Sequence, residues 1–451
     1  MSTPIPTPSS QTGLRALKAM LRERHPLAAM QVFHDELGDV FRVQLPGFTP
    51  VVMVGPEAAR FVLLDARDRL RWRNEQDPVT HLLRHGVLVE DGEEHDRLRR
   101  TMTPALHRRM VDGYVDVMRR RTDQIVAGWA DGGTVDMLVE MRKVALLILL
   151  DALYQVDFTP ELERLWGSIL GIIQYISPGP WMVWRGLPRP QYRCALRQMD
   201  EYLYRIIRER RSLMDLCRGA MPLSVVSRLP GGKTGADHPP DLLDLLIRAD
   251  MDDGLIRDQL LTMLIAGHDT STALLAWTLY LLGSHPHTLR RAYDEVDVVL
   301  GSEPPRPEQV SKLEFLGRVI KESLRLYPPI HLGSRLAATD LEYQGYHIPA
   351  GERVIYSVYL TQRHKAYWPD PNLFDPDRHT SGARQAPYSW LAFGGGPRTC
   401  IGAGFGLVEA KVVLARLLQG FELTLVEPHV HPHMGATLEP RPGVRMRVQR
   451  R

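Results

Sequence analysis

The sequence has few cysteines and no long apolar run. Cysteine occupies only positions 194, 217 and 400 of 451, and an odd, scattered set argues against a disulfide framework and for a reducing compartment. The longest apolar run on a helix-like segment, Val144 to Leu150, ends at an aspartate, whereas a bilayer span needs about 20 apolar residues. The N-terminal stretch reads as neither a signal peptide nor an anchor. We therefore expect a cytoplasmic protein that crosses no membrane.

The sequence also has little net charge and no repeat of fixed period. Lys and Arg number 56 against 53 Asp and Glu, a formal net charge of +3. A charged partner must therefore be met by a local patch, and bulk charge gives no basis for nucleic-acid binding. Apolar residues make up 44 % and charged residues 24 %. This composition excludes disorder and predicts a large buried core.

Most of the chain has the apolar spacing of helices. The expected helical segments are 97–125, 136–154, 160–175, 191–218, 255–284, 286–300, 311–327 and 402–419. Alternation around a Pro-Gly turn predicts a β-hairpin from about Val40 to Val54, and turns at 344–345 and 349–351 indicate a second region of short strands. The breaker-rich loop Leu229 to Pro240 joins two helical segments. We expect a mainly α chain with a minor β part, folded as a single two-lobed domain over residues 1–451 with no fused reductase.

A glycine-rich loop, FGGGPRTCIGAGFG at residues 393–406, delivers Cys400 to the start of a helical segment. Unpaired amides and the helix dipole lower a thiol's pKa at such a position, and the thiolate is the form that binds metal. Glycines at 394–396 let the backbone fold tightly against a flat ligand. The alternative, a buried and inert cysteine, is the commoner state of a lone cysteine.

This loop resembles the haem-binding signature of the cytochrome P-450 family, F-G-x-G-x-[RH]-x-C-x-G. The matching residues are Phe393, Gly394, Gly396, Arg398, Cys400 and Gly402. The family's other motifs follow in order along nearly the whole chain. The resemblance implies a helix-rich lobe and a small β-rich lobe around a buried haem b, a cofactor that Phe393, Gly394 and Gly402 contact. It makes Cys400 the proximal ligand of the haem iron.

The predicted helix at 255–284 contains AGHDTST, from Ala266 to Thr272. Gly267 weakens a helix, and the Thr270 hydroxyl can reach the Ala266 carbonyl four residues back, so we expect a local opening there. The segment is similar to the family's [AG]-G-x-[DE]-T-[TS] motif. That resemblance places Ala266 at the haem, gives Thr270 the task of steadying bound oxygen, and gives Asp269 a place in a proton relay.

Two further sets of residues follow from the resemblance. Glu322 and Arg325, three apart on a helix, would be only a surface ion pair if taken alone. The family's E-x-x-R pair and a later arginine, here Arg378, instead imply a buried structural triad that braces the cysteine loop. Haem propionates need cations at the rim, and the family positions for that work are His95, Arg99, Arg335 and Arg398.

The resemblance also implies redox partners and a substrate pocket. Between Arg97 and Arg121 eight arginines face two aspartates, a local balance of +6, which would attract an acidic ferredoxin or flavodoxin electron donor with its own NAD(P)H reductase. No nucleic-acid module is present. Family position assigns the pocket to apolar residues, namely Leu82, Leu83, Val87, Leu88, Ile265, Ile330 and Leu332, together with the turn at 434–438.

Two surface features remain open to different interpretations. The aromatic loop from Trp181 to Trp184 is either a channel lid, a contact with a membrane surface, or ordinary packing. Histidines 429, 431 and 433 alternate as a metal tract would, but without an acidic or cysteine partner they are typical of adventitious surface histidines.

The expected function is that of a haem-thiolate monooxygenase, which inserts one atom of O2 into an apolar molecule such as a fatty acid, terpenoid or carotenoid, by hydroxylation or epoxidation. The alternatives are a haem-thiolate isomerase or dehydratase and a non-enzymatic haem binder. The Asp269–Thr270 pair favours the first, because oxygen must be protonated twice before its bond breaks.

Overall fold

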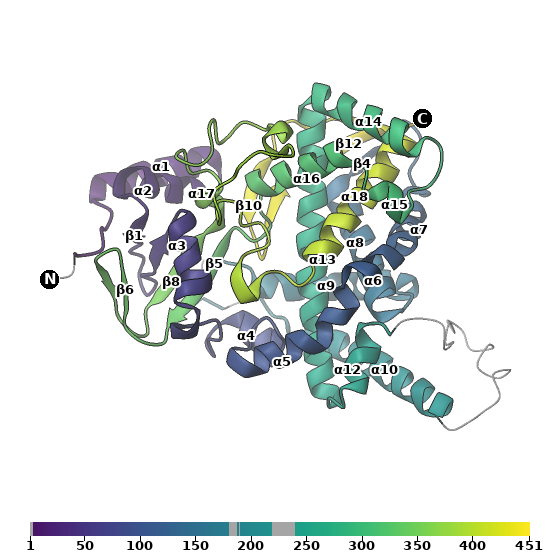
Figure 1. The fold of residues 1–451 in the computed structure, drawn as a ribbon, viewed down its shortest axis with the longest axis horizontal. Coiled ribbons are helices and arrows are strands. Elements are labelled where there is room, and N and C mark those ends of the chain that lie inside the picture. The colour runs from purple at the N-terminus through teal and green to yellow at the C-terminus, as the bar shows by residue number, and fades with distance from the viewer. Residues whose placement is uncertain (1–2, 180–186, 189, 219–239) are drawn as a thin grey trace.

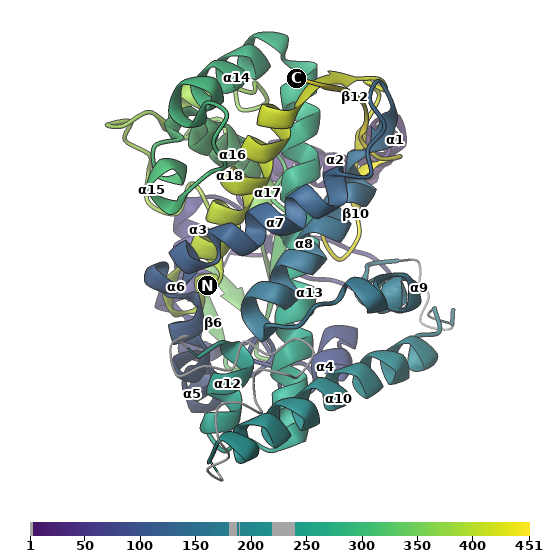
Figure 2. The same ribbon diagram turned by 90° about the vertical axis from the view of Figure 1, so that its right-hand side faces the viewer.

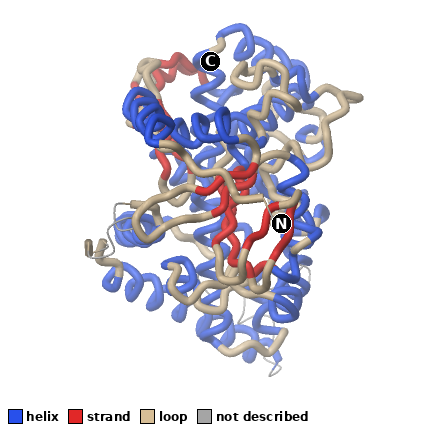
Figure 3. Tube along the Cα trace, turned by 90° about the vertical axis from the view of Figure 1, so that its left-hand side faces the viewer, coloured by secondary structure: helices blue, strands red, loops and turns tan. Residues whose placement is uncertain are grey.

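The structure, a computed structural model, describes residues 3–179, 187–188, 190–218 and 240–451. Helices fill one side of the molecule, and most strands lie on the other side with the N-terminal helices (Figure 1). In Figure 3 the larger group of red strands lies against the body of blue helices, and a smaller group lies near the C-terminus. This arrangement confirms the expected mainly α fold with a minor β part. Among the described residues no helix is long and apolar enough to span a bilayer.

The helices follow one another along the whole chain. They are α1 (Ser10–Glu23), α2 (Leu27–Leu37), α3 (Pro56–Arg60), α4 (Pro78–Leu83), α5 (Gly92–Met102), α6 (Arg108–Gly113), α7 (Val115–Val126), α8 (Met137–Tyr154), α9 (Leu162–Ile176), α10 (Arg193–Arg218), α12 (Leu242–Arg248), α13 (Asp253–Ser284), α14 (Pro286–Leu300), α15 (Pro307–Val310), α16 (Glu314–Leu326), α17 (Val358–Thr361) and α18 (Ala403–Gly420).

The strands are short. They are β1 (Val40–Arg42), β2 (Val51–Met53), β3 (Leu70–Arg71), β4 (Thr134–Asp136), β5 (Leu332–Ala337), β6 (Leu341–Tyr343), β7 (Tyr346–Ile348), β8 (Arg353–Ser357), β9 (Phe421–Leu425), β10 (His431–Met434), β11 (Leu438–Arg441) and β12 (Arg445–Arg450). One five-stranded sheet has the order β1-β2-β8-β5-β3, a three-stranded sheet has the order β4-β12-β9, and β6-β7 and β10-β11 form separate pairs.

Both expected strand regions are confirmed. β1 and β2 pair antiparallel with Phe41 opposite Val52. β6 and β7 are joined by Gln344 and Gly345, which have φ values of 48° and 83°, as a two-residue hairpin turn with both central residues left-handed requires. The helical expectations need one correction, because 97–125 does not form a single helix. Pro104 lies in a 3-10 turn after α5, and Gly113 ends α6.

Helix α13 runs through the body of the molecule, and α8, α16 and α18 pack around it (Figure 2). Its 32 residues carry apolar side chains on every side and are mostly buried. Gly267 permits the contact with α8, since a Cβ at that position would lie 2.3 Å from Leu149 Cδ1. The expected opening of the helix at Gly267 is wrong, because α13 is helical without a break from Asp253 to Ser284. This glycine therefore serves close packing.

Glu322 and Arg325 on α16 are fully buried, which excludes the surface-pair reading. Arg325 Nε donates to Glu322 Oε2 at 2.7 Å, and Arg325 Nη2 donates to Oε1 at 2.8 Å. Arg378 Nε lies 3.4 Å from Glu322 Oε1, and His379 Nε2, which the sequence analysis missed, lies 3.0 Å from Oε2. The Arg325 guanidinium also donates to the carbonyls of residues 362, 371 and 373. The cluster thus joins α16 to the segment that leads toward the cysteine loop.

Replacing Arg325 by Ala should lower the free energy of unfolding by about 3–5 kcal/mol, because it leaves the Glu322 carboxylate buried without its main partner. The matched control is Arg97→Ala. Arg97 also pairs with a glutamate three residues before it, Glu94, but both side chains are nearly half exposed, and its loss should cost less than about 1 kcal/mol. Urea unfolding followed by circular dichroism measures both. Equal effects of the two substitutions would contradict a bracing role for the buried pair.

Candidate functional site

The glycine-rich loop wraps back on itself and presents Cys400 just before α18. The Cys400 amide donates to the Phe393 carbonyl at 2.9 Å, and the Thr399 amide donates to the Gly396 carbonyl at 3.0 Å. Gly394 and Gly396 have φ values of 70° and 64°, a region that favours glycine. A Cβ on Gly396 would also lie 2.5 Å from the Leu63 carbonyl oxygen. These two glycines therefore fix the path of the loop.

The Cys400 side chain is accessible to solvent, although protein surrounds it on most sides. Desolvation by that protein raises the pKa of the thiol, while the Gly402 amide and the Arg99 charge lower it. Desolvation has the larger effect, so burial opposes the lowered pKa expected from the helix start. Deprotonation would instead accompany metal binding, since a metal selects the thiolate.

One stretch of α13 faces open space. Ala266 is exposed and Thr270 is partly so, whereas their neighbours Ile265, His268 and Asp269 are buried. Residues four apart share a helix face, so the two accessible positions form one small polar spot. The Thr270 hydroxyl donates to the Ala266 carbonyl at 2.7 Å, which confirms the expected back-bond.

Asp269 points away from that face into a buried polar cluster. Its Oδ2 accepts a hydrogen bond from Thr437 at 2.8 Å, and its Oδ1 lies 3.5 Å from the Arg142 guanidinium, which also binds Glu439. Burial raises the pKa of Asp269, Glu439 raises it further, and Arg142 lowers it. No hydrogen bond joins Asp269 to Thr270, so a proton passing between them needs an intermediate carrier such as water.

A buried contact that the sequence analysis missed ties α13 to the cysteine helix. Ser271 Oγ donates to Glu409 Oε2 on α18 at 2.5 Å. Burial raises the pKa of Glu409 to about 8, so this carboxyl is mostly protonated at neutral pH. The contact joins the residue next to Thr270 to the helix that follows Cys400, and it thereby fixes the relative position of the two halves of the site.

The four residues expected at the propionates form a cationic cluster. Burial, Arg398 and Arg99 all lower the pKa of the buried His95. Burial lowers the pKa of Arg398 to about 10, and Arg335 and Arg99 lower it as well. Arg398 Nη2 donates to Asp91 Oδ1 at 2.6 Å, so one aspartate offsets part of this charge. Basic groups that lower one another's pKa in this way are typical of a site that binds an anion.

Several of these cations are already fixed by backbone oxygens. Arg99 Nη2 donates to the Thr399 carbonyl at 2.6 Å, which brings α5 onto the residue before Cys400. Arg335 Nη1 donates to the Ser334 carbonyl at 2.7 Å. The Cys400 thiol, the small Ala266 with the Thr270 hydroxyl on α13, and a cluster of cations lie at this site. Together they fit a flat iron cofactor that carries carboxylates, such as haem.

The residues expected to line a pocket divide into two groups. Leu82 and Leu83 are buried in the main hydrophobic core, as are Val87 and Ile265 with slight exposure, while Leu88 is 38 % and Ile330 44 % exposed. Leu332, on β5, is partly buried. The 84–90 loop lies against α13, because a Cβ on Gly86 would come within 1.8 Å of Thr262 Oγ1. Of these residues, Leu88, Ile330 and Leu332 are the ones that offer apolar surface to a ligand.

Four of the eight arginines in the basic stretch form local ion pairs. The paired members are Arg97, Arg119, Arg120 and Arg121, whose partners are Glu94, Asp116, Asp123 and Asp151. Arg100, Arg108 and Arg109 are exposed and have no ion pair within the described ranges. The positive charge that this stretch offers to a partner is therefore smaller than the balance counted from the sequence. The lid residues Trp181 to Trp184 lie outside the described residues.

Comparison with known proteins agrees with this site. The chain matches the cytochrome P450 family over residues 7–444. It is 31 % identical to the pentalenene oxygenase of Streptomyces avermitilis, over 95 % of this chain and 94 % of that protein. It is 30 % identical to the cyclooctat-9-en-7-ol 5-monooxygenase of Streptomyces melanosporofaciens, over 86 % and 83 % of the two chains.

A solved structure shares the fold over the whole chain. The crystal structure of the cytochrome P450DA heme domain aligns with a TM-score of 0.82 at 28 % identity, covering 100 % of this chain and 97 % of that one. The combination of a cysteine loop, a hydroxyl-bearing central helix, a family match across nearly every residue and this shared fold shows that the chain belongs to the cytochrome P450 family of haem-dependent monooxygenases.

Proposed function

We propose that this enzyme inserts one oxygen atom from O2 into an apolar organic substrate, by hydroxylation or epoxidation, with electrons from NAD(P)H supplied by a separate ferredoxin or flavodoxin. The observation that carries this proposal is the accessible Thr270 hydroxyl, held by the Ala266 carbonyl on an otherwise buried helix. A haem isomerase, a dehydratase or a haem sensor does not need a placed hydroxyl and a buried acid to supply protons. The proposed unit is one two-lobed domain over residues 1–451.

In this proposal Cys400 Sγ holds the haem iron, and Ala266, Phe393, Gly394 and Gly402 leave room for the flat ring. Arg99, Arg335 and Arg398, together with the imidazole of His95, would hold its carboxylates. When bound, the haem supplies the activation of O2 that amino-acid side chains cannot perform. Glu322, Arg325 and Arg378 keep the loop in place without touching the cofactor.

The protein's own chemical task is to deliver protons. Thr270 Oγ1 offers a hydrogen-bonding group on the accessible stretch of α13. Asp269, whose pKa is raised by burial, is suited to exchange protons near neutral pH. Because the two side chains point in different directions, the proposed relay passes through water between them.

The substrate proposed for this site is mostly apolar. Leu88 and Ile330 expose apolar side chains, Leu332 is partly buried, and Val87 and Ile265 are buried with slight exposure. Apolar walls with few polar anchors are typical of sites for apolar ligands. Two relatives are named for pentalenene and for cyclooctat-9-en-7-ol, and these names describe a hydrocarbon and an alcohol with a single hydroxyl. A terpenoid therefore fits better than a small polar molecule.

Thr270→Ala should preserve haem binding and send more of the NAD(P)H electrons to hydrogen peroxide, because proton delivery loses its ordered hydroxyl. A reconstituted ferredoxin system with 18O2 measures product per NAD(P)H consumed and the oxygen isotope in the product. Thr278→Ala, which removes another buried hydroxyl of α13 that bonds four residues back, is the control and should keep the wild-type coupling. Unlabelled product, or unchanged coupling in Thr270→Ala, would contradict the proposal.

Electron delivery should depend on the unpaired arginines. Arg108 and Arg109 are exposed on α6, which packs on the cysteine helix α18. Reversing both to Glu should slow reduction by ferredoxin most at low salt, where charge steering is strongest. Arg119→Glu and Arg120→Glu, which remove arginines already paired with Asp116, serve as the comparison. A salt series in stopped flow tests this, and equal rates for the two double variants would exclude α6 as the docking site.

A further inference from the structure

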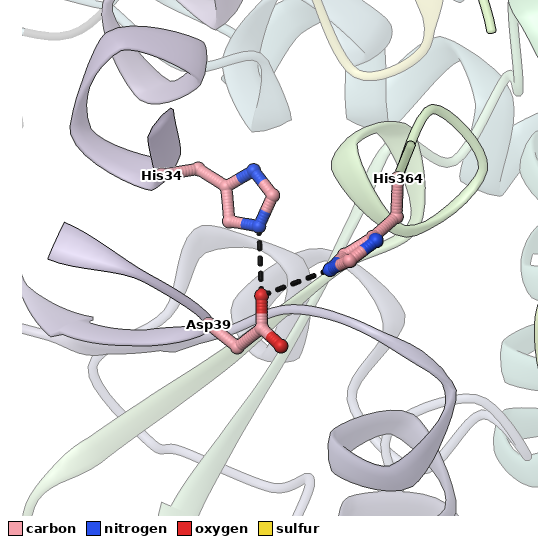
Figure 4. A group of neighbouring side chains, drawn as sticks. All are labelled: His34, Asp39 and His364. Carbon is pink, nitrogen blue, oxygen red and sulfur yellow. Dashed lines mark hydrogen bonds and ion pairs between the residues drawn. The ribbon is translucent and has the colours of Figure 1, made fainter. Parts of the chain in front are cut away.

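Away from the cysteine site, two histidines converge on one aspartate. His34 Nε2 lies 2.8 Å from Asp39 Oδ1, and His364 Nε2 lies 3.1 Å from the same oxygen (Figure 4). The candidate ligand atoms of all three residues lie within 4.8 Å of one another, and no other such group of histidine, cysteine or acidic side chains occurs in the described parts of the chain. Their separation in sequence hides this group from any motif search.

The backbone holds each member of the group. His34 lies in the last turn of α2, whose end is capped by the Gly38 amide donating to the His34 carbonyl at 3.0 Å. The Asp39 carbonyl accepts from the Val54 amide at 2.8 Å. His364 follows α17, and its carbonyl accepts from the amides of residues 367 and 368. The side chains are therefore directed at one another by fixed elements.

The burial of the group leaves one side open. The imidazoles of His34 and His364 are 11 % and 16 % exposed, whereas the Asp39 carboxylate is half exposed. Gly55 lies beside it, since a Cβ there would be 3.7 Å from Asp39 Oδ2. An ion held by the three side chains would thus keep open positions for water on the carboxylate side.

We propose that His34, Asp39 and His364 bind a first-row divalent cation such as Zn2+, which links the α2–β1 junction to the segment after α17. Two imidazoles and one carboxylate are a common ligand set for such ions, with zinc–ligand distances of about 2.0–2.2 Å. A tetrahedral ion with those bonds separates its ligands by roughly 3.4 Å. The two imidazole contacts with Asp39, at 2.8 and 3.1 Å, need only to open slightly to reach that separation.

The positions of the protons on the two imidazoles weaken metal binding at this site. The Ala366 amide donates to His364 Nδ1 at 3.2 Å, so the neutral ring carries its proton on Nε2, toward Asp39. Metal binding moves that proton to Nδ1, with no net proton release, and ends the Ala366 hydrogen bond. His34 Nδ1 is buried without a protein partner, so a proton there gains nothing. We therefore expect an exchangeable ion held more weakly than in a closed cysteine and histidine site.

The test is calorimetric titration of the untagged, chelator-treated haem protein with Zn2+. Wild type should bind its tightest equivalent at one Zn2+ per chain, and His34→Gln and His364→Gln should each lose that equivalent. Glutamine keeps an N–H donor for Asp39 but is a poor zinc ligand, so the fold is expected to survive. Circular dichroism and the haem spectrum check that it does.

The matched control is the triple variant in which His429, His431 and His433 become Ala. This surface tract should make no contribution to the tightest equivalent. X-ray absorption at the zinc edge of the wild-type protein gives an independent readout, since the bound zinc should show two imidazole ligands. Absence of binding, its survival in both glutamine variants, or its loss in the triple variant would show an adventitious ion only and would overturn the proposal.

Discussion

The fold depends on a helix that is buried on almost every side. Because α13 presents apolar side chains all around, it must be enclosed by protein, and α8, α16 and α18 supply that cover. Gly267 permits the close contact with α8, since a Cβ there would lie 2.3 Å from Leu149 Cδ1. Near the middle of α13, Ala266, Gly267 and Thr270 remain accessible. A functional site arises where this enclosure is incomplete.

Buried polar groups then fix what packs around that opening. Glu409 of α18 reaches Ser271 of α13, which sets the start of the cysteine helix against the accessible face. On α16 the Glu322–Arg325 pair gathers several carbonyls of the chain that leads to the same loop. Buried polar groups that are hydrogen-bonded to one another specify one arrangement of their neighbours, so these contacts fix the geometry of the site.

The sequence could predict the local features. Alternation and turn residues located both strand regions, and the spacing of Thr270 and Ala266 predicted a bond that the structure contains. Segment boundaries were less accessible, since Pro104 and Gly113 divide the predicted helix at 97–125. A tolerated glycine, such as Gly267, and one that ends a helix look the same in a periodic pattern.

The sequence could not predict contacts between distant residues. Glu409 reads as an ordinary polar position on a helix, yet it is buried against Ser271, 138 residues away. Likewise, the direction in which Asp269 points depends on Arg142 and Glu439, which belong to other elements. Such pairs carry no spacing signal, because tertiary packing alone brings them together.

The central claim is that Cys400 ligates the haem iron as a thiolate beside the accessible face of α13. The most direct measurement is the absorption spectrum of the reduced, carbon-monoxide-bound protein. Thiolate ligation predicts a strongly red-shifted Soret band in wild type and in Cys194→Ser, which removes the other described free cysteine, and loss of that band in Cys400→Ser. A normal band in folded wild type, or a red-shifted band that persists in Cys400→Ser, would contradict the account.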